Sequence, residues 1–346
     1  MPVTIKDVAR KARVSVATVS RVLNEKEAVR EGTRRRIQAT IERLGYAPHG
    51  AARSLSTRQT KTIGVLLPDI YGEFFSELIR GIDATMRRNG HHLLVSGSHG
   101  DKSEAGAMLR AMRGRVDGLI VLSPEVGEAF PAHLSEALPV VLLNSAANGG
   151  AFDLINIDNY EGAFAMVRHL AGLGHRRIAF IRGPEENRDA QERLRGYRQA
   201  MAELSKRPTA ELEFSGNFRE EAGYLAGQRI RELEKRPTAI FAANDSMAVG
   251  CLHALREAGA RVPEDFALAG FDDIPIASFT APPLTSVRVS IAELGRCAAE
   301  RVLYGVRHKN GYKRQHMTLP TALVIRDSTG SDRSLGKNGT RMEEGG

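Results

Sequence analysis

Polar and charged side chains follow several apolar runs of this chain, where they could bind a hydroxylated ligand. Asn244 follows the run 239–243, Asp272 follows 266–271, and Arg193 lies in an amphipathic segment before both. An arginine and a carboxylate, together with an amide, can bracket vicinal hydroxyl groups through charge-assisted hydrogen bonds. This set of side chains favours a carbohydrate ligand.

The residue patterns of common catalytic and cofactor sites are missing. The sequence has no P-loop, no His-Glu-x-x-His helix, no Gly-x-Ser-x-Gly elbow and no dinucleotide fingerprint. Its two cysteines, Cys251 and Cys297, are far apart and lack a Cys-x-x-Cys or histidine-rich neighbourhood, so neither a disulfide framework nor a zinc site is predicted. We therefore expect no catalytic residue, no metal ligand and no cofactor.

Apolar runs alternate with amphipathic stretches from Lys61 onward. This alternation is typical of βαβ units, in which helices cover both faces of a parallel sheet. Because the rhythm repeats after residue 176, two similar doubly wound α/β lobes are predicted. The predicted strands cover residues 62–67, 92–95, 117–122, 139–143, 154–157, 177–181, 210–214, 239–243 and 266–270, and one of the helices between them covers 75–89.

Positive charge is concentrated in the first 60 residues. They hold thirteen Lys and Arg against five Asp and Glu, a net charge of +8. The whole chain also carries +8, so residues 61–346 are balanced. Such an asymmetry is typical of a segment that binds a polyanion, most simply DNA, although the count alone also fits a solvated basic face.

The basic segment has the spacing of three short helices. A capping box begins a helix over residues 5–12, and Ser15 can cap a second helix over 16–23. A third helix covers 33–44 and ends at Gly45. Because a three-residue turn separates the first two helices, an all-α helix-turn-helix head is predicted ahead of the α/β core.

These segments resemble the lac/gal/pur repressor family over nearly the whole chain. Motifs that begin at Val3, Val14, Thr33, Leu44 and Ala52 carry the similarity in the first 60 residues. Ile63-Gly-Val, Gly196-Tyr, Ala243-Asn-Asp-Ser-Met-Ala and Gly270-Phe-Asp-Asp carry it in the remainder. The resemblance implies a sequence-specific DNA-binding repressor of carbohydrate-utilisation genes, with a core like that of periplasmic sugar-binding proteins. It also implies a homodimer on a pseudo-palindromic operator, controlled allosterically by a small molecule, a sugar, held between the lobes.

The resemblance further implies that the second helix enters the major groove. Val16 and Ala17 match positions that vary with the operator, and their small apolar side chains favour contact with thymine methyl groups. Arg21 is the candidate for hydrogen bonds to a base or phosphate, whereas Thr18 and Ser20 can equally be capping or surface groups. The predicted DNA-binding residues are Thr4, Ser15, Val16, Ala17, Thr18, Ser20, Arg21, Asn24, Ala52, Arg53 and Leu55.

The segment after the head resembles the family's hinge helix, which forms on the operator. Leu55 matches a side chain wedged into the minor groove, and Ala52 matches the contact between two hinge helices. His49 and Gly50 stand where Asn and a non-glycine residue are usual, and a Gly costs a helix about 1 kcal/mol. Arg13 also departs from the pattern, because it stands in a turn where Gly is common and a positive φ is often needed.

The resemblance also implies the ligand-binding residues of the core. Phe74, Phe75 and Phe218 match aromatic walls around a sugar or base ring. The polar residues of the set lie near the carboxyl ends of strands, where open α/β sheets bind ligands. Asn144 and Ser145 depart from the family's usual residues, so a purine is disfavoured and the sugar stays open. In the alternative interpretation the phenylalanines are core residues and the charges form ion pairs. The predicted set is Phe74, Phe75, Ser123, Asn144, Asp189, Arg193, Phe218, Asn244 and Asp272.

The predicted domains are a head over 1–47, a hinge over 48–60, a core over 61–328 and a disordered tail over 329–346. The first lobe is expected at about 61–159 and 290–318, and the second at about 160–289 and 319–328. Because we find neither a signal peptide nor an apolar run of about 20 residues, a cytoplasmic protein without membrane contact is expected. The competing classes are a sugar-binding transport component, which the core alone would support, and a sugar-processing enzyme.

Overall fold

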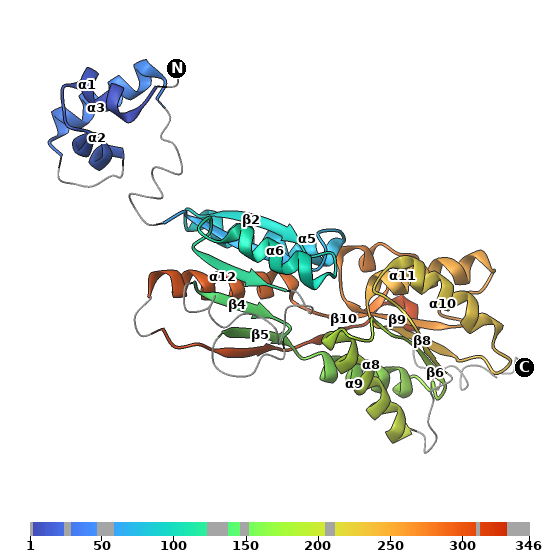
Figure 1. The fold of residues 1–346 in the computed structure, drawn as a ribbon. Coiled ribbons are helices and arrows are strands. Elements are labelled where there is room, and N and C mark those ends of the chain that lie inside the picture. The colour runs from blue at the N-terminus through green and yellow to red at the C-terminus, as the bar shows by residue number, and fades with distance from the viewer. Residues whose placement is uncertain are drawn as a thin grey trace, which may run out of the picture. The chain divides into compact units, whose positions relative to one another are not determined.

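The computed structural model describes residues 3–23, 29–46, 59–122, 138–145, 152–204, 212–308 and 312–330. The chain divides into two compact units, Met1–Lys61 and Thr62–Gly346. The first unit is helical and the second combines helices with two sheets (Figure 1). The predicted fold class is confirmed.

In the part of the first unit that the structure describes, there are three helices, as the sequence predicts. Val8, Val19 and Ile37, one from each helix, are completely buried in a small shared core. The third helix begins two residues earlier than predicted, with Glu31 in its first turn, where an acidic side chain favours the helix dipole. The helices are α1 (Ile5–Ala12), α2 (Val16–Leu23) and α3 (Glu31–Leu44).

The turn between α1 and α2 requires a left-handed backbone conformation at Arg13. This residue has φ 52° and ψ 51°, and its N–H donates to the carbonyl of Arg10 at 3.3 Å. A side chain in this conformation costs about 1–2 kcal/mol relative to a right-handed one. The expected positive φ is therefore present, and the head accommodates an arginine where glycine would be less strained.

The first lobe is built on a six-stranded parallel sheet with the order β11-β5-β4-β3-β1-β2. Its strands are β1 (Thr62–Leu67), β2 (His92–Gly97), β3 (Gly118–Val121), β4 (Val140–Leu143), β5 (Asp153–Ile157) and β11 (His316–Leu319). Alternate residues of β1 belong to two different apolar clusters, because successive side chains point to opposite faces. Helices α5 (Glu73–Arg88) and α12 (Ile291–Arg307) pack together on one face, and α6 (Lys102–Met112) covers the other.

The second lobe repeats this plan with the order β12-β10-β9-β8-β6-β7, in which only β12 is antiparallel to its neighbour. Its strands are β6 (Ile178–Ile181), β7 (Glu213–Phe214), β8 (Ala239–Ala242), β9 (Ala267–Asp272), β10 (Thr285–Arg288) and β12 (Ala322–Val324). Figure 1 shows α8 (Asn159–Gly172) with α9 (Arg188–Leu204) on one side of the sheet, and α10 (Glu220–Glu232) with α11 (Asp245–Glu257) on the other. The short strands β10, β11 and β12 were not predicted.

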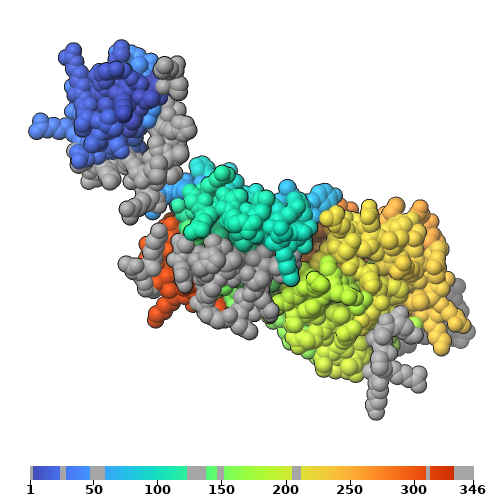
Figure 2. Space-filling model, in the orientation of Figure 1, coloured from blue at the N-terminus to red at the C-terminus, as the bar shows by residue number. Residues whose placement is uncertain are grey.

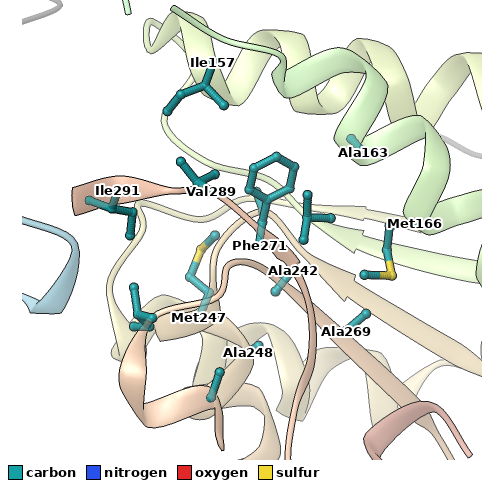
Figure 3. Packing of buried hydrophobic residues seen from close by; sticks show 14 of the residues in the cluster. Ile157, Ala163, Met166, Ala242, Met247, Ala248, Ala269, Phe271, Val289 and Ile291 are labelled. Atoms are coloured by element: carbon teal, nitrogen blue, oxygen red, sulfur yellow. The ribbon is translucent and has the colours of Figure 1, made fainter. Parts of the chain in front are cut away.

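The chain passes between the lobes at residues 158, 289–290 and 320–321. Because β5 and β10 both cross at their carboxyl ends, the carboxyl ends of both sets of parallel strands lie at the boundary between the lobes. Ile157, Val289 and Ile291, beside two of these crossings, belong to the main hydrophobic cluster together with Phe271 of β9 (Figure 3). The cluster therefore continues through the connections that join the lobes.

The predicted disordered tail begins too early. Thr329, which was assigned to the tail, is 3% exposed and ends a 3-10 helix over Asp327–Thr329. Its hydroxyl lies 3.0 Å from that of Thr285, and the hydroxyl of Ser328 donates to the carbonyl of Leu268 at 2.6 Å. These hydroxyl groups anchor the segment on β9 and β10. Residues 331–346 lie outside the described residues.

Candidate functional site

Arg193 of α9 is the centre of a buried polar cluster at the strand ends of the second lobe. Its side chain is 4% exposed. Nε donates to Oδ1 of Asn159 at 2.7 Å, Nη1 donates to the carbonyl of Ala243, and Nη2 lies 2.9 Å from Oδ1 of Asp272. The guanidinium also lies over the ring of Phe271, 3.8 Å from its centroid. With three polar partners and one aromatic face, the planar guanidinium is held in one orientation.

Asn159 connects this arginine to the first lobe. Its Nδ2 donates to Oδ1 of Asp189 at 2.9 Å, and the other oxygen of Asp189 accepts a hydrogen bond from Nδ2 of Asn144 at 2.7 Å. Asn144 follows β4 of the first lobe, whereas Asp189 lies in α9 of the second. We call Asn144, Asn159, Asp189, Arg193 and Asp272 the interlobe cluster, which brings together four of the predicted ligand-binding residues.

Two carboxyl groups of the interlobe cluster hold their protons more tightly than usual. Burial raises the pKa of Asp189 to about 6, and burial likewise raises the pKa of Asp272 to about 6. The positive charge of Arg193 opposes both shifts, while the charge of Asp272 adds to the shift of Asp189. The cluster therefore combines one permanent positive charge with two carboxyl groups that exchange protons about one pH unit below neutral.

Two buried oxygen atoms of the cluster accept no hydrogen bond within the described ranges. They are Oδ1 of Asn144 and Oδ1 of Asp272, although the latter is ion-paired with Arg193. Asn144 is 9% exposed and has φ 50°, so its amide is held in place by a constrained backbone. A buried acceptor without a donor is costly, and a ligand hydroxyl can supply that donor. The cluster can thus accept from and donate to a polyhydroxylated molecule.

Asn244 is linked to the interlobe cluster indirectly, because it binds Phe218, whose ring lies near Arg193. Its Oδ1 caps α11 by accepting from the N–H of Met247 at 3.0 Å, and its Nδ2 donates to the carbonyl of Phe218 at 2.9 Å. Phe218 has φ 68°, and its ring packs so closely on Gly183 that a Cβ there would overlap it. The Phe218 centroid is 5.8 Å from the guanidinium of Arg193. Asn244 thereby positions an aromatic ring beside the arginine.

Phe74 and Phe75 lie in the first turn of α5, in the other lobe. Their rings meet edge to face, with centroids 5.6 Å apart and planes at 85°. Both are half-buried and pack against the main hydrophobic cluster, an arrangement compatible with core residues as well as with a ligand wall. Ser123 lies outside the described residues.

Asn159 and Asp245 were not selected by the sequence reasoning. Asn159 stands two residues after β5, so the rule that polar residues at strand ends bind ligands would have found it. Asp245 is completely buried and accepts from the hydroxyl of Ser286 at 2.6 Å and the N–H of Ile274 at 2.9 Å. Burial, and next the charge of Asp272, raise its pKa well above the usual value. In sequence it is an ordinary acidic residue in the first turn of a helix, a position that acidic residues favour.

Two further contacts join the lobes beside α5. Nη2 of Arg219 lies 3.0 Å from Oδ2 of Asp69, and the N–H of Ile276 donates to Oε2 of Glu73 at 2.9 Å. The blue-green surface of the first lobe adjoins the yellow surface of the second in Figure 2. A groove of about 430 Å³ lies here, lined by Ile70, Tyr71, Gly72, Glu73, Ser76, Glu220, Ser246, Val249, Ile274 and Ile276. It includes none of the interlobe cluster.

The predicted recognition residues occupy the outer side of α2 in the head. Val19 and Val22 are buried, whereas Val16 is 41% exposed and Ala17 and Arg21 are also exposed. The helix therefore divides its apolar side chains between the core of the head and the solvent. Val16 and Ala17 are free to contact another molecule without disturbing that core.

Some of the other predicted DNA-binding residues have partners within the head. The hydroxyl groups of Ser15 and Thr18 lie 2.8 Å apart, and the N–H of Thr18 donates to the Ser15 hydroxyl at 3.1 Å, as in the capping interpretation. The N–H and hydroxyl of Thr4 both donate to Asp7, and these bonds lower the pKa of Asp7. Ser20 is half-buried. Asn24, Ala52, Arg53 and Leu55 lie outside the described residues.

No described helix is both long and apolar enough to span a membrane. In the same ranges, no three His, Cys, Asp or Glu side chains gather so that they could hold a metal ion. Cys251 and Cys297 are free and buried.

Both units match known protein families. Residues 4–49 match the bacterial regulatory proteins of the lacI family, and residues 167–329 match the periplasmic binding protein-like domain. The chain is 35% identical over 332 residues to catabolite control protein A of Priestia megaterium, covering 95% of this chain and 100% of the relative. The chain belongs to the LacI family. A second LacI-family relative, the ribose operon repressor of Escherichia coli K12, is 36% identical over 333 residues, covering 94% of this chain and 99% of the relative.

Solved structures of LacI-family proteins have the same architecture. The lac repressor dimer bound to operator and the anti-inducer ONPF matches with a TM-score of 0.83 and 29% identity, over 96% of this chain and 100% of that chain. A LacI family regulator from Enterococcus faecium with bound ribose matches with a TM-score of 0.69 and 27% identity, over 78% of this chain and 98% of that chain. This LacI-family protein is a DNA-binding transcriptional regulator and not an enzyme, which confirms the prediction from sequence.

Proposed function

We propose that this LacI-family regulator is a repressor that binds a pseudo-palindromic operator as a homodimer. The exposed outer side of α2 supports the proposal, as does the similarity to a lac repressor solved as a dimer on its operator. In this proposal α2 enters the major groove, Val16 and Ala17 contact base edges, and Arg21 bonds to a base or a phosphate. Thr4, Ser15, Thr18, Ser20 and Asn24 contact the DNA backbone.

The segment between the two units acts in this proposal as a hinge that orders on DNA. Leu55 enters the minor groove, Ala52 meets the partner's hinge and Arg53 contacts phosphate. The protein acts in the cytoplasm and needs no cofactor. The proposed limits are a head over 1–47, a hinge over 48–60, lobes over 61–157 with 291–319 and 159–288 with 322–330, and a tail over 331–346, with residues 158, 289–290 and 320–321 connecting the lobes.

The proposed effector is a sugar that binds at the interlobe cluster. The observation that carries this proposal is the hydrogen bond from Asn144 to Asp189 between the lobes, beside the buried Oδ1 of Asn144, which has no donor among the described residues. Arg193 donates to the sugar, and Asn144 and Asp272 accept from it. Phe74, Phe75 and Phe218 cover the faces of the ring, and Ser123 and Asn244 complete the site. The ribose operon repressor and the ribose-bound relative make ribose the first sugar to test.

Sugar binding is coupled to operator binding through the arrangement of the lobes. A ligand changes that arrangement only if it binds one arrangement more tightly than another. Contacts through the sugar replace the direct bond between Asn144 and Asp189, so the lobe angle follows the occupancy of the site. β1 begins at Thr62, directly after the hinge, so a change in the lobe angle reaches the hinge through β1. We expect a coupling free energy of about 1–3 kcal/mol.

Calorimetric titration with a panel of sugars, in the presence and absence of an operator fragment, tests this function. The expected result is that ribose or a related sugar binds, that its affinity changes when operator is present, and that a purine base does not bind. Failure of every sugar both to bind and to change operator affinity would contradict the effector proposal. A transport component would not retard the promoter fragment, and an enzyme would consume the sugar.

A further inference from the structure

The strands of the first lobe all begin at one edge of their sheet. The register places Thr62 beside His92, Ile63 beside Gly118 and His316 beside Leu154, as expected for parallel neighbours. α5, α6 and α12 end at the same edge, because the chain must return there before the next parallel strand begins. We call the basic edge the surface formed by Lys61 and the segments 87–92, 110–117, 307–308 and 312–316.

The basic edge carries a large positive charge. It contains nine Lys and Arg against one acidic residue, Asp117. Residues 61–346 as a whole contain as many acidic as basic residues, so the remainder of the second unit carries a negative charge of equal size. The basic residues are Lys61, Arg87, Arg88, Arg110, Arg113, Arg115, Arg307, Lys313 and Arg314, and all except the half-buried Arg314 are exposed.

The fold itself does not require this charge. The corresponding edge of the second lobe consists of segments 170–177, 230–238 and 255–266, which lead into β6, β8 and β9. These segments hold seven Lys and Arg against five Asp and Glu. Arg261 and Asp265 in this edge pair with each other at 3.2 Å, whereas Arg87 of the basic edge pairs at 2.9 Å with Asp83, which lies outside that edge. Two lobes with the same topology therefore differ sharply in the charge of equivalent edges.

Favourable interactions with helix dipoles explain only some of the Lys and Arg residues in the basic edge. Arg87, Arg88, Arg110 and Arg307 lie in the last turns of helices, where cations are favoured. Arg113 and Arg115 follow the end of α6, and Lys313 and Arg314 follow that of α12. Among the residues that the structure describes, neither Arg113 nor Arg115 forms an ion pair with a carboxylate. Positive charges gathered on one edge without carboxylate partners disfavour one another, and a bound polyanion relieves that repulsion.

We propose that the basic edge binds the phosphate backbone of the duplex whose bases the head contacts. The chain enters the first lobe at this edge, because β1 begins at Thr62 after the unit boundary at Lys61. Residues 45–61 separate α3 from β1, and at about 3.5 Å per residue they reach at most about 60 Å. A head bound to an operator thereby keeps the basic edge at high local concentration near the same duplex.

Duplex DNA fits this surface better than an acidic protein does. Protein interfaces are anchored by buried aromatic and apolar side chains. Within the described segments of the basic edge, no large apolar side chain is exposed. A surface of spaced cations, with only Tyr304 and Met317 exposed as large apolar side chains directly beside its segments 307–308 and 312–316, matches the regularly spaced charges of a phosphate backbone. The inference rests on the proposed binding of an operator by the head.

The test compares three double variants of the full chain in operator binding at several salt concentrations. R113Q/R115Q removes two charges from the basic edge, R113K/R115K keeps them, and K235Q/R236Q removes two exposed charges from the corresponding edge of the second lobe. Each lost phosphate contact lowers the slope of log K against log salt by about 0.9, so R113Q/R115Q lowers it by about 2 per chain. Operator and random duplex weaken alike, because phosphate contacts read no sequence.

R113K/R115K and K235Q/R236Q should keep the wild-type slope of log K against log salt. A wild-type slope for R113Q/R115Q, with an unchanged melting temperature, would overturn the inference while leaving operator binding by the head intact. Failure of the wild-type protein to prefer any operator over random duplex would overturn the proposed function itself. Poly-glutamate binding that R113Q/R115Q loses, with the salt slope unchanged, would assign the basic edge to an acidic protein and also overturn the inference.

Discussion

Asn144 of the first lobe donates a hydrogen bond of 2.7 Å to Asp189 of the second, across 45 positions of sequence. The contact links the end of β4 to α9, and through Asn159 to the ion pair between Arg193 and Asp272. The arrangement of the lobes therefore depends on polar groups that a ligand can engage.

Asn144→Ala removes the bond between the lobes and leaves an oxygen of Asp189 without its donor. We expect the free energy of unfolding to fall by about 1 kcal/mol and sugar affinity to fall roughly tenfold. Asn187→Ala is the control, because Asn187 lies two residues before Asp189 and its Oδ1 accepts from the N–H of Ala190 at 3.0 Å. Calorimetry should show weakened sugar binding only for Asn144→Ala. Wild-type sugar affinity in that variant would place the ligand elsewhere.

Arg193→Ala should keep operator binding and abolish the response to the sugar. The change leaves the buried carboxyl of Asp272 without its cation, so we also expect a loss of about 3 kcal/mol in unfolding free energy. Arg195→Ala is the matched control on α9, since Arg195 is exposed and pairs with Glu192. Gel shifts with increasing sugar distinguish the two variants. A retained response at wild-type sugar concentrations in Arg193→Ala would show that the site is misplaced.

The raised pKa of Asp189, about 6 against an ordinary 3.8, has a defined effect on stability. Between these values the folded protein binds more protons than the unfolded chain, so the stability contributed by this group is present below pH 4 and is lost as the pH rises through 6. For this half-buried group we expect about 1–2 kcal/mol. Asp189→Asn should make this part of the pH profile less steep in urea titrations, and Asp272, whose pKa is also raised to about 6, should supply the slope that remains.

Asp265→Asn is the control with the opposite sign. Hydrogen bonds from Arg261 lower the pKa of Asp265, so its contribution to stability is lost as the pH falls through the lowered value. Replacing it should therefore change the acid side of the profile and leave the region between pH 4 and 6 as in the wild type. A profile of Asp189→Asn that matches the wild type throughout this region would contradict the assignment.

Arg21→Ala should weaken operator binding by about 1–3 kcal/mol if the contact is to a base. Arg35→Ala is the control in the same basic head, because Arg35 is an exposed residue of α3 that pairs with Glu31 at 3.0 Å. Both variants remove one charge, so a comparison of operator with random duplex separates loss of a base contact from loss of charge. Equal operator affinities for the two variants would remove the special role of Arg21.

Gly250→Ala should be strongly destabilising because α10 and α11 pack with their backbones in close approach. A Cβ at Gly250 would overlap the carbonyl oxygen of Glu220, and neither backbone can move without separating the helices. We expect a loss of about 3 kcal/mol or more. Gly172→Ala, at a position with nothing within 4 Å of the new Cβ, should be neutral or stabilising by a few tenths of a kcal/mol. Thermal unfolding measures both.

The order and type of the main elements follow from local sequence patterns. Each of the nine predicted strands is present as β1 to β9, because a parallel strand covered by helices is a short, largely apolar run that can be found without knowledge of its neighbours, even where it is only half-buried as in β2 and β7. β11, over His316–Leu319, was not predicted because it is a four-residue strand, mostly exposed at a sheet edge, in which apolar and polar residues alternate too briefly to be recognised. The end of the chain was also misjudged, since the burial of Thr329 depends on hydroxyl groups of distant segments.

The sequence by itself determined that a basic helical head precedes two α/β lobes with polar residues at their strand ends, because composition and periodicity are local properties. Only the tertiary structure decided that Asn144 meets Asp189, that Arg193 is held by Asn159, and that basic segments more than 200 residues apart share one edge. A charge count along the chain records no direction in space, so the balanced total of residues 61–346 concealed a polarised lobe. Contacts between distant residues depend on strand register and helix packing, which no local pattern encodes.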